Sequence, residues 1–393
     1  MPDSQGVYLD HAATTPLDPV VLAAMEPYLT AAYGNPSSLY RLGQEARAAV
    51  DTARAQAASV LGCAPGEVLF TSGATESNNL ALRGAAWGAR LAAPEKPPPH
   101  LVTTAIEHHA VLHTAESLAR QGFRVTFVRP DQEGIVSAAS IASAVEHDTC
   151  LISVMLANNE TGVIQPIAEI AAVAQEHNIR LHTDAVQGAG LLSLDVEDLG
   201  VDLLALSAHK FYGPKGVGLL YVRQGTLLDY QQTGGGQEQG RRGGTENVAG
   251  VAGLGVALQR AESFRVAYAA HCRAMRDQLA AGIFAALPDA ILNGPPLEGP
   301  RLPNNLNVSI PGIQGETMLL ALDLLDVAAS AGSACTTGNS EPSHVLTAMG
   351  LSAETCRSAL RFTVGRGTTP DEIVAAVEAV VEAAARVRSL AGV

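Results

Sequence analysis

Short apolar runs alternate with longer amphipathic stretches over most of this chain. Seven runs have the length and the branched apolar content of buried strands, namely residues 68–71, 101–104, 124–128, 150–157, 179–183, 203–207 and 217–222. Helical periodicity between them predicts helices at 44–61, 76–91, 109–121 and 167–177. Because strands buried on both faces read as continuous apolar runs, this alternation predicts an α/β domain with a mostly parallel sheet.

The pattern changes after about residue 246. An alanine-rich helical stretch covers roughly residues 246–286, and a smaller α+β unit follows from about residue 305. Its expected elements are strands 305–310, 327–330 and 359–364, a helix at 316–324 and a final helix. Thr369, Pro370 and Glu372 mark the start of that final helix, because they fit an N-cap, a first-turn proline and a capping box.

Composition narrows the classes of function. The chain has 393 residues, which favours two or three domains, and its net charge of −14 argues against broad contact with nucleic acid or anionic membranes. Its first residues lack the pattern of a signal peptide, and no apolar run approaches the roughly 20 residues of a membrane span. Its five cysteines are scattered, without metal-binding spacing. We therefore expect a cytoplasmic protein with reduced cysteines and no metal site.

The stretch "VLFTSGATESNNLAL" at residues 68–82 is the first candidate for a binding site. A strand runs into a turn of small residues, and a helix begins directly after it. Such a turn leaves backbone N–H groups at a helix N-terminus, where they commonly hold a phosphate. The alternative is an ordinary helix N-cap in an α/β unit.

Two strand ends carry charged residues. Asp184 follows the strand in "RLHTDAVQGAG", at the edge of the sheet where open α/β sheets bind ligands, although a helix N-cap is the simpler alternative. Lys210 ends the strand in "LSAHKFYGPKG", where its amine could form a Schiff base with a carbonyl group. Lys215, in the Gly/Pro turn that follows, is expected to be solvated and to have no role in the chemistry.

Cys335 lies in "ASAGSACTTGNSEPS", among small and flexible residues. A thiol in such a segment could reach a substrate and carry a group away, although it could also be an incidental loop cysteine. A phosphate cradle, a strand-end carboxylate and a strand-end lysine together point to pyridoxal 5′-phosphate, which needs one partner each for its phosphate, ring nitrogen and aldehyde.

Motifs along nearly the whole chain resemble those of the cysteine desulfurases, the NifS/IscS-like group of the class V aminotransferase family. They occur in the family's order: "YLDHAATTP", "GNPSS", "FTSGATESNN", "NNETG", "HTDAVQ", "SAHKFYGPKG", "RGGTEN", "GSAC" and "LRFTVGR". The resemblance implies a homodimer with the aspartate aminotransferase-like fold of pyridoxal-phosphate-dependent transferases. A large domain at 15–258 would hold a seven-stranded sheet. Residues 1–14 with 259–393 would form a smaller domain, carrying a mobile cysteine loop at about 330–342.

The resemblance also implies roles for individual residues. Lys210 would hold the cofactor aldehyde, Asp184 the ring nitrogen and Gln187 the ring hydroxyl, while His108 would stack on the ring and move protons. The other implied cofactor contacts are Asn159, Ala74, Thr75, Ser207, His209 and, from the second subunit, Thr245. Arg361 and Asn35 would bind the substrate carboxylate. Position alone does not separate His108 from His109, or Asn159 from Asn158.

The implied activity is removal of sulfur from L-cysteine, which gives L-alanine and a persulfide on Cys335. Acceptor proteins for iron–sulfur cluster assembly or tRNA thiolation would then take the sulfur. One alternative is a selenocysteine lyase or another pyridoxal-phosphate lyase, which product analysis with both amino acids would separate. Another is a catalytically inactive sulfur-carrier scaffold, which purified protein without yellow cofactor would favour.

Overall fold

A seven-stranded sheet forms the centre of the larger part of the molecule, in a computed structural model that describes residues 6–331 and 342–391. The strand order is β2-β8-β7-β6-β5-β3-β4. The strands are β2 (Val68–Thr71), β3 (His100–Thr104), β4 (Arg124–Val128), β5 (Thr149–Ser153), β6 (Arg180–Asp184), β7 (Leu203–Ser207) and β8 (Gly218–Val222). Neighbouring strands are parallel except where β8 pairs antiparallel with β2 and β7. The mostly parallel sheet expected from the sequence is confirmed.

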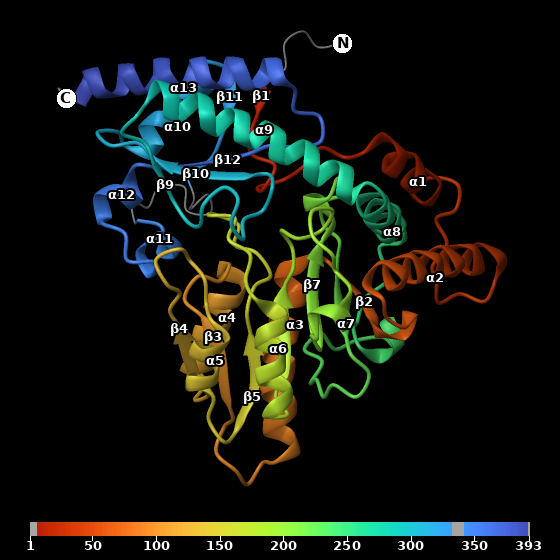
Figure 1. Cartoon of the computed structure of the whole chain (residues 1–393). Coiled ribbons are helices and arrows are strands. Elements are labelled where there is room, and N and C mark those ends of the chain that lie inside the picture. Colours follow the sequence, from red (N-terminus) through yellow and green to blue (C-terminus); the bar gives the residue numbers. More distant parts are fainter. Residues whose placement is uncertain (1–5, 332–341, 392–393) are drawn as a thin grey trace.

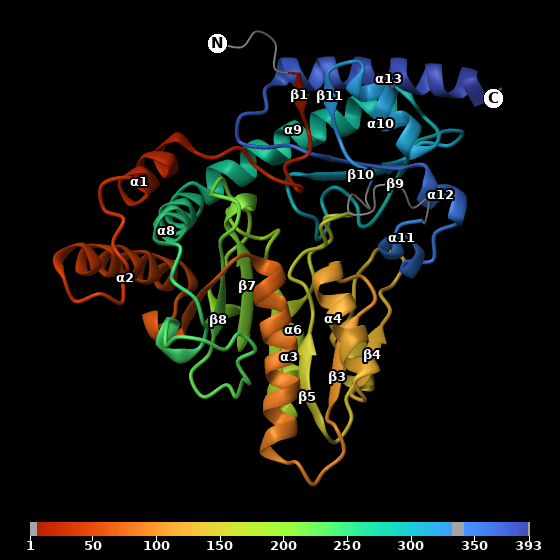
Figure 2. The ribbon, with the colours of Figure 1, turned by 180° about the vertical axis from the view of Figure 1, so that it is seen from behind.

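Helices cover both faces of this sheet (Figures 1 and 2). On one face lie α3 (Ala74–Ala92) and α4 (His109–Arg120); the core of the other includes α2 (Arg41–Leu61), α5 (Ala138–Ala144), α6 (Ile167–Glu176), α7 (Val196–Leu199) and α8 (Val248–Ser263). Alternate strand residues pack into the two cores. Leu69 packs with α3 and α4, whereas Val68 and Phe70 pack into the core on the opposite face. This two-sided burial explains the unbroken apolar runs in the sequence.

A smaller unit with its own core lies at one end of the sheet, at the top of Figure 1. It contains an antiparallel sheet, β12-β10-β9, and a parallel pair, β1-β11. Its elements are β1 (Val7–Tyr8), α9 (Arg265–Ala286), β9 (Ile291–Leu292), β10 (Asn305–Ser309), α10 (Gly315–Asp323), β11 (Val327–Ala328), β12 (Ala359–Thr363) and α13 (Pro370–Ala391). The division into residues 15–258 and residues 1–14 with 259–393 stays a prediction, and its second boundary falls within α8.

Three further helices complete the main elements: α1 (Pro19–Leu29), α11 (His344–Ala348) and α12 (Ala353–Arg357). The strand expected at 327–330 is shorter, because β11 ends at Ala328, and two other expected elements differ more. The helical stretch 246–286 is broken at Phe264, where the chain passes from the larger core to the smaller one. The strand expected at 150–157 ends at Ser153, although the residues that follow stay buried, and Val154 and Leu156 donate backbone hydrogen bonds to β6.

None of the helices within residues 6–331 and 342–391 combines the length and apolar character that a membrane span requires.

Candidate active site

A cavity of about 670 Å³ opens at the carboxyl ends of the parallel strands. Because β6 and β7 are adjacent and parallel, the residues that follow both strands meet at this edge. The cavity is lined by ten of the residues that the sequence singled out: Ala74, Thr75, His108, Asn159, Asp184, Gln187, Ser207, His209, Lys210 and Arg361. Residues separated by almost 300 positions in the chain thus share one site.

Asp184, the last residue of β6, is held in a fixed orientation. Its side chain is 5% exposed, and its two oxygens accept hydrogen bonds from different groups. The Asn78 amide on α3 donates to Oδ2 at 2.6 Å, and the Val186 backbone N–H donates to Oδ1 at 3.1 Å. Asn78 was not assigned a role from the sequence, although it lies four residues after Ala74, one helical turn away on the same face.

Lys210 lies just beyond β7, at the end of a single 3₁₀ turn that covers Ala208–Lys210. Its ammonium donates hydrogen bonds to the carbonyls of Ala12 at 2.5 Å and Ala13 at 2.7 Å. The Gln187 amide also donates to the Ala12 carbonyl, at 3.1 Å. The "HAATT" segment therefore forms one wall of the site. Its residues are small and weakly polar, so the sequence did not predict this position.

The structure distinguishes the neighbouring histidines by position. His108 is the N-cap of α4 and lines the cavity, whereas His109 stacks on His113 outside the lining. Burial lowers the pKa of His108, Lys210 lowers it further, and Asp184 opposes both. Its Nδ1 accepts from the Ala110 backbone N–H at 3.1 Å, so the neutral ring carries its proton on Nε2. Such a ring is available for proton transfer near neutral pH.

Glu107 is a buried carboxyl that the sequence did not single out. It is 0% exposed, and its Oε1 accepts from Thr104 Oγ1 and from the Met155 backbone N–H, both at 2.9 Å. Its Oε2 is buried and has no hydrogen-bond partner among residues 6–331 and 342–391. Burial, together with the charge of Asp184, raises the pKa of Glu107 to about 8. The signal in the sequence was a carboxylate directly before His108 in an otherwise apolar stretch.

The start of α3 forms one end of the cavity, which we call the phosphate end because it suits an anionic group. Gly73 is the N-cap, with a φ of +153°, and no side chain caps this first turn. Glycine is required here, because side chains rarely adopt that backbone conformation. Ser207 and His209 lie across from the turn in the same lining, and burial lowers the pKa of His209 to about 4. Backbone N–H groups at a long helix's N-terminus fit an anionic group.

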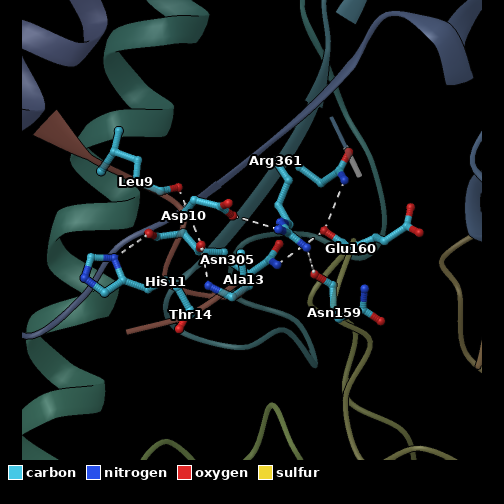
Figure 3. Close-up of polar contacts among 12 residues, drawn as sticks. Leu9, Asp10, His11, Ala13, Thr14, Asn159, Glu160, Asn305 and Arg361 are labelled. Carbon is cyan, nitrogen blue, oxygen red and sulfur yellow. Dashed lines mark hydrogen bonds and ion pairs between the residues drawn. The ribbon is translucent and has the colours of Figure 1, made fainter. Parts of the chain in front are cut away.

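Arg361, on β12, lines the cavity from the smaller unit and is 3% exposed; Figure 3 shows its polar contacts. One terminal nitrogen donates to Asp10 Oδ1 at 2.7 Å and the other to the Asn159 carbonyl at 2.9 Å. Its Nε is buried and has no hydrogen-bond partner in the part of the chain that the structure describes. The Asn158 amide instead donates to the Ile106 carbonyl, and its Oδ1 accepts from backbone N–H groups two and three residues further on. Asn159, not Asn158, therefore lines the cavity.

Three expected residues are not brought to this cavity by the single chain as described. Asn35 is exposed, and its side chain accepts from the Ser37 backbone N–H. Thr245 is exposed in the glycine-rich segment before α8 and does not line the cavity. Cys335 lies outside the described residues. Their roles stay predictions.

Comparison with known proteins places the chain in a class and then in a family. The family model "Aminotransferase class-V" matches residues 7–375, so the chain is a class-V aminotransferase-type protein. "Cysteine desulfurase IscS" of Clostridium botulinum strain Hall is 46% identical over 367 residues, covering 93% of this chain and 91% of that one. The chain belongs to the cysteine desulfurase family.

Solved structures agree with that assignment. A "NifS-like protein" matches with a TM-score of 0.89 and 36% identity, covering 97% of this chain and all of that one. A structure described as "SspA in complex with cysteine" matches with a TM-score of 0.79 and 37% identity, covering 92% and 99%.

The residues present fit pyridoxal 5′-phosphate. The cavity holds an amine, a buried carboxylate and an uncapped helix N-terminus, which are the partners that the aldehyde, ring nitrogen and phosphate require.

Proposed function

We propose that this cysteine desulfurase uses pyridoxal 5′-phosphate to convert L-cysteine into L-alanine and leaves the sulfur as a persulfide on Cys335. The observation that carries the proposal is the convergence of Lys210, Asp184 and the α3 N-terminus on one cavity. When bound, this cofactor supplies an electron sink for charge that develops at the amino-acid Cα. The protein must then hold the cofactor, orient the substrate and move protons.

Lys210 would hold the cofactor aldehyde through its ε-amine, and Asp184 would keep the ring nitrogen protonated. The hydrogen bonds to both Asp184 oxygens fix that carboxylate while leaving a lone pair on each oxygen for another donor. His108, neutral and partly buried at the cavity wall, would accept or return protons together with the Lys210 amine, once substrate has displaced that amine.

Arg361 would bind the substrate carboxylate. Its contacts with Asp10 and the Asn159 carbonyl hold the guanidinium plane in place, and its buried Nε, which no other described residue accepts from, provides a donor for a second carboxylate. Bound there, the amino acid would direct its amino group toward Lys210.

The described residues on either side of the Cys335 segment contact Arg361 or residues next to the cavity lining. Before it, Ser330 and Arg361 exchange backbone hydrogen bonds. After it, Ser343 bonds to Glu160, next to Asn159, and His344 Nε2 lies 3.0 Å from the Glu107 carbonyl. These anchors support transfer of sulfur to Cys335. Overall, cysteine and the Cys335 thiol give alanine and a persulfide, and no external oxidant or reductant is needed.

Replacing the cysteine tests this assignment. Cys335→Ala should keep the visible absorption of the bound cofactor and its change on adding L-cysteine, but should produce neither alanine nor sulfide. Cys63→Ala, at a half-buried position outside the cavity lining, is the matched control and should retain activity. Normal turnover by Cys335→Ala would show that another group takes the sulfur.

We also propose that two copies of the chain assemble and that Thr245 of each copy completes the cofactor site of the other. Thr245 is exposed and away from its own cavity, which supports a contact with a second copy. Co-expressing Lys210→Ala with Thr245→Ala should give mixed dimers in which one site has both native residues. These should regain the cofactor affinity that each variant lacks, whereas no recovery would argue for sites confined to single subunits.

A further inference from the structure

Lys215 lies at the phosphate end of the cavity. The sequence predicted that this lysine is solvated in a turn and has no role in the chemistry. The chain has only three lysines, and two of them, Lys210 and Lys215, line this cavity. Lys215 is exposed, as expected, but it shares the cavity lining with Ser72, Thr75 and His209.

The pairing of two strands explains this position. β8 runs antiparallel to β2, with Gly218 opposite Thr71, so the turn before β8 lies beside the turn after β2. The approach is close: a Cβ on Gly218 would lie 2.7 Å from the Gly73 Cα, which excludes any larger residue there. The Lys215 turn is therefore held against the start of α3.

The other charges at this end are already matched. Glu76, in the first turn of α3, pairs with Arg242 at 2.5 Å and accepts from the Ser72 backbone N–H at 2.8 Å. Burial, with help from Lys210 and Lys215, holds the pKa of His209 near 4, so this ring is neutral at physiological pH. Arg361 pairs with Asp10 at the opposite end.

Lys215 differs from these charged residues. Among the described residues it makes no ion pair, so its charge is available to a ligand. A phosphate monoester carries nearly two negative charges at neutral pH, and a helix N-terminus offsets only about half of one.

We propose that Lys215 is a cofactor-binding residue whose ammonium neutralises the phosphate of pyridoxal 5′-phosphate from the open side of the cavity. This inference rests on the proposed cofactor. It assigns separate tasks to the two lysines of the "HKFYGPKG" motif: Lys210 serves the aldehyde and Lys215 the phosphate. Because Lys215 is exposed, its contribution is modest and falls as salt screens it.

Equilibrium binding to the cofactor-free full-length protein tests the proposal. Lys215→Gln should weaken binding of pyridoxal 5′-phosphate about fivefold at low salt, and the difference should vanish toward molar salt. Binding of pyridoxal, which has the aldehyde but no phosphate, should not change. Lys215→Arg should restore most of the affinity, and Lys96→Gln, at an exposed lysine outside the cavity lining, should behave as wild type.

Three results would count against these proposals, and each has a different meaning. Unchanged affinity of Lys215→Gln for pyridoxal 5′-phosphate would overturn the proposal. So would an equal loss for pyridoxal, because that would indicate a general disturbance of the turn. If wild-type protein bound neither compound, the proposed cofactor itself would be wrong.

Discussion

The two ends of the cavity are built on different principles. At the ring end, the buried Asp184 and Asn78 are joined by a hydrogen bond between β6 and α3, and the buried Glu107, outside the lining, accepts hydrogen bonds from Thr104 and Met155. At the phosphate end, a helix N-terminus and the exposed side chains of Thr75 and Lys215 face a more open space. The buried end requires specific side chains in one arrangement, whereas the open end relies largely on backbone groups and a screened charge.

This difference has a physical consequence. Charges interact more strongly in a low-dielectric interior, and an unpaired buried polar group is costly, so a single change at the ring end has large effects. Solvent replaces lost contacts at the open end, so changes there are small and depend on salt. We therefore expect substitutions at the ring end to have larger effects than substitutions at the phosphate end.

The largest effect is expected at Lys210. Lys210→Ala should lower alanine formation from L-cysteine by about a thousandfold or more, because both the attachment of the cofactor and a proton-transfer group are lost. Steady-state assays with added cofactor measure this, and Lys96→Ala serves as the control. Activity within tenfold of wild type would place the essential amine elsewhere.

Asp184→Asn should lower kcat by about 10²- to 10³-fold, because the charge that stabilises the protonated ring is lost. The amide also presents N–H groups to Asn78 or Val186, which are themselves donors. The matched control is Asp202→Asn, at a buried carboxylate directly before β7 that accepts from Arg180 and the Leu181 N–H outside the cavity. That variant should lose stability but keep kcat; equal losses of kcat would indicate a structural role for both.

Glu107→Gln should change how stability depends on pH. The pKa of Glu107 is raised from 4.5 to about 8, so between these values the folded chain keeps a proton that the unfolded chain has released. Wild-type stability therefore falls as pH rises through this window. The variant cannot ionise, so its free energy of unfolding should gain on wild type by up to about 1.4 kcal/mol per pH unit.

Urea unfolding at several pH values between about 5 and 8 measures this gain. Glu116→Gln, an exposed carboxylate on α4, should give no such slope. Parallel curves for wild type and Glu107→Gln would mean that the buried carboxyl stays ionised.

The smallest effect is expected at the phosphate end. Ser207→Ala removes one hydroxyl from the cavity lining and should weaken binding of pyridoxal 5′-phosphate by about threefold to tenfold, without altering binding of pyridoxal. Fluorescence titration of the cofactor-free protein measures both. A thousandfold loss would contradict the view that this end is redundant and solvent-supported.

Local sequence patterns determined much of the fold and part of the site. The strands ending at Thr71 and Ser207 were readable from apolar runs and turns, because a doubly covered parallel sheet demands them. Asp184 and Lys210 could be singled out because each lies at or just beyond the end of such a strand, and parallel strands bring their carboxyl ends to one edge. The break at Phe264 was not readable, since both flanking stretches favour helix equally.

Only the tertiary structure decided which groups meet across the sheet. Asn78 reaches Asp184, which lies 106 residues further on, because α3 packs over β6. Lys215 faces the start of α3 because β8 inserts antiparallel between β2 and β7. Each turn directs only one of two adjacent residues into the cavity lining. His108 lines it rather than His109, and Asn159 lines it rather than Asn158. Adjacent residues share composition and propensity, so the sequence alone does not order them, whereas strand order and helix packing fix their directions in space.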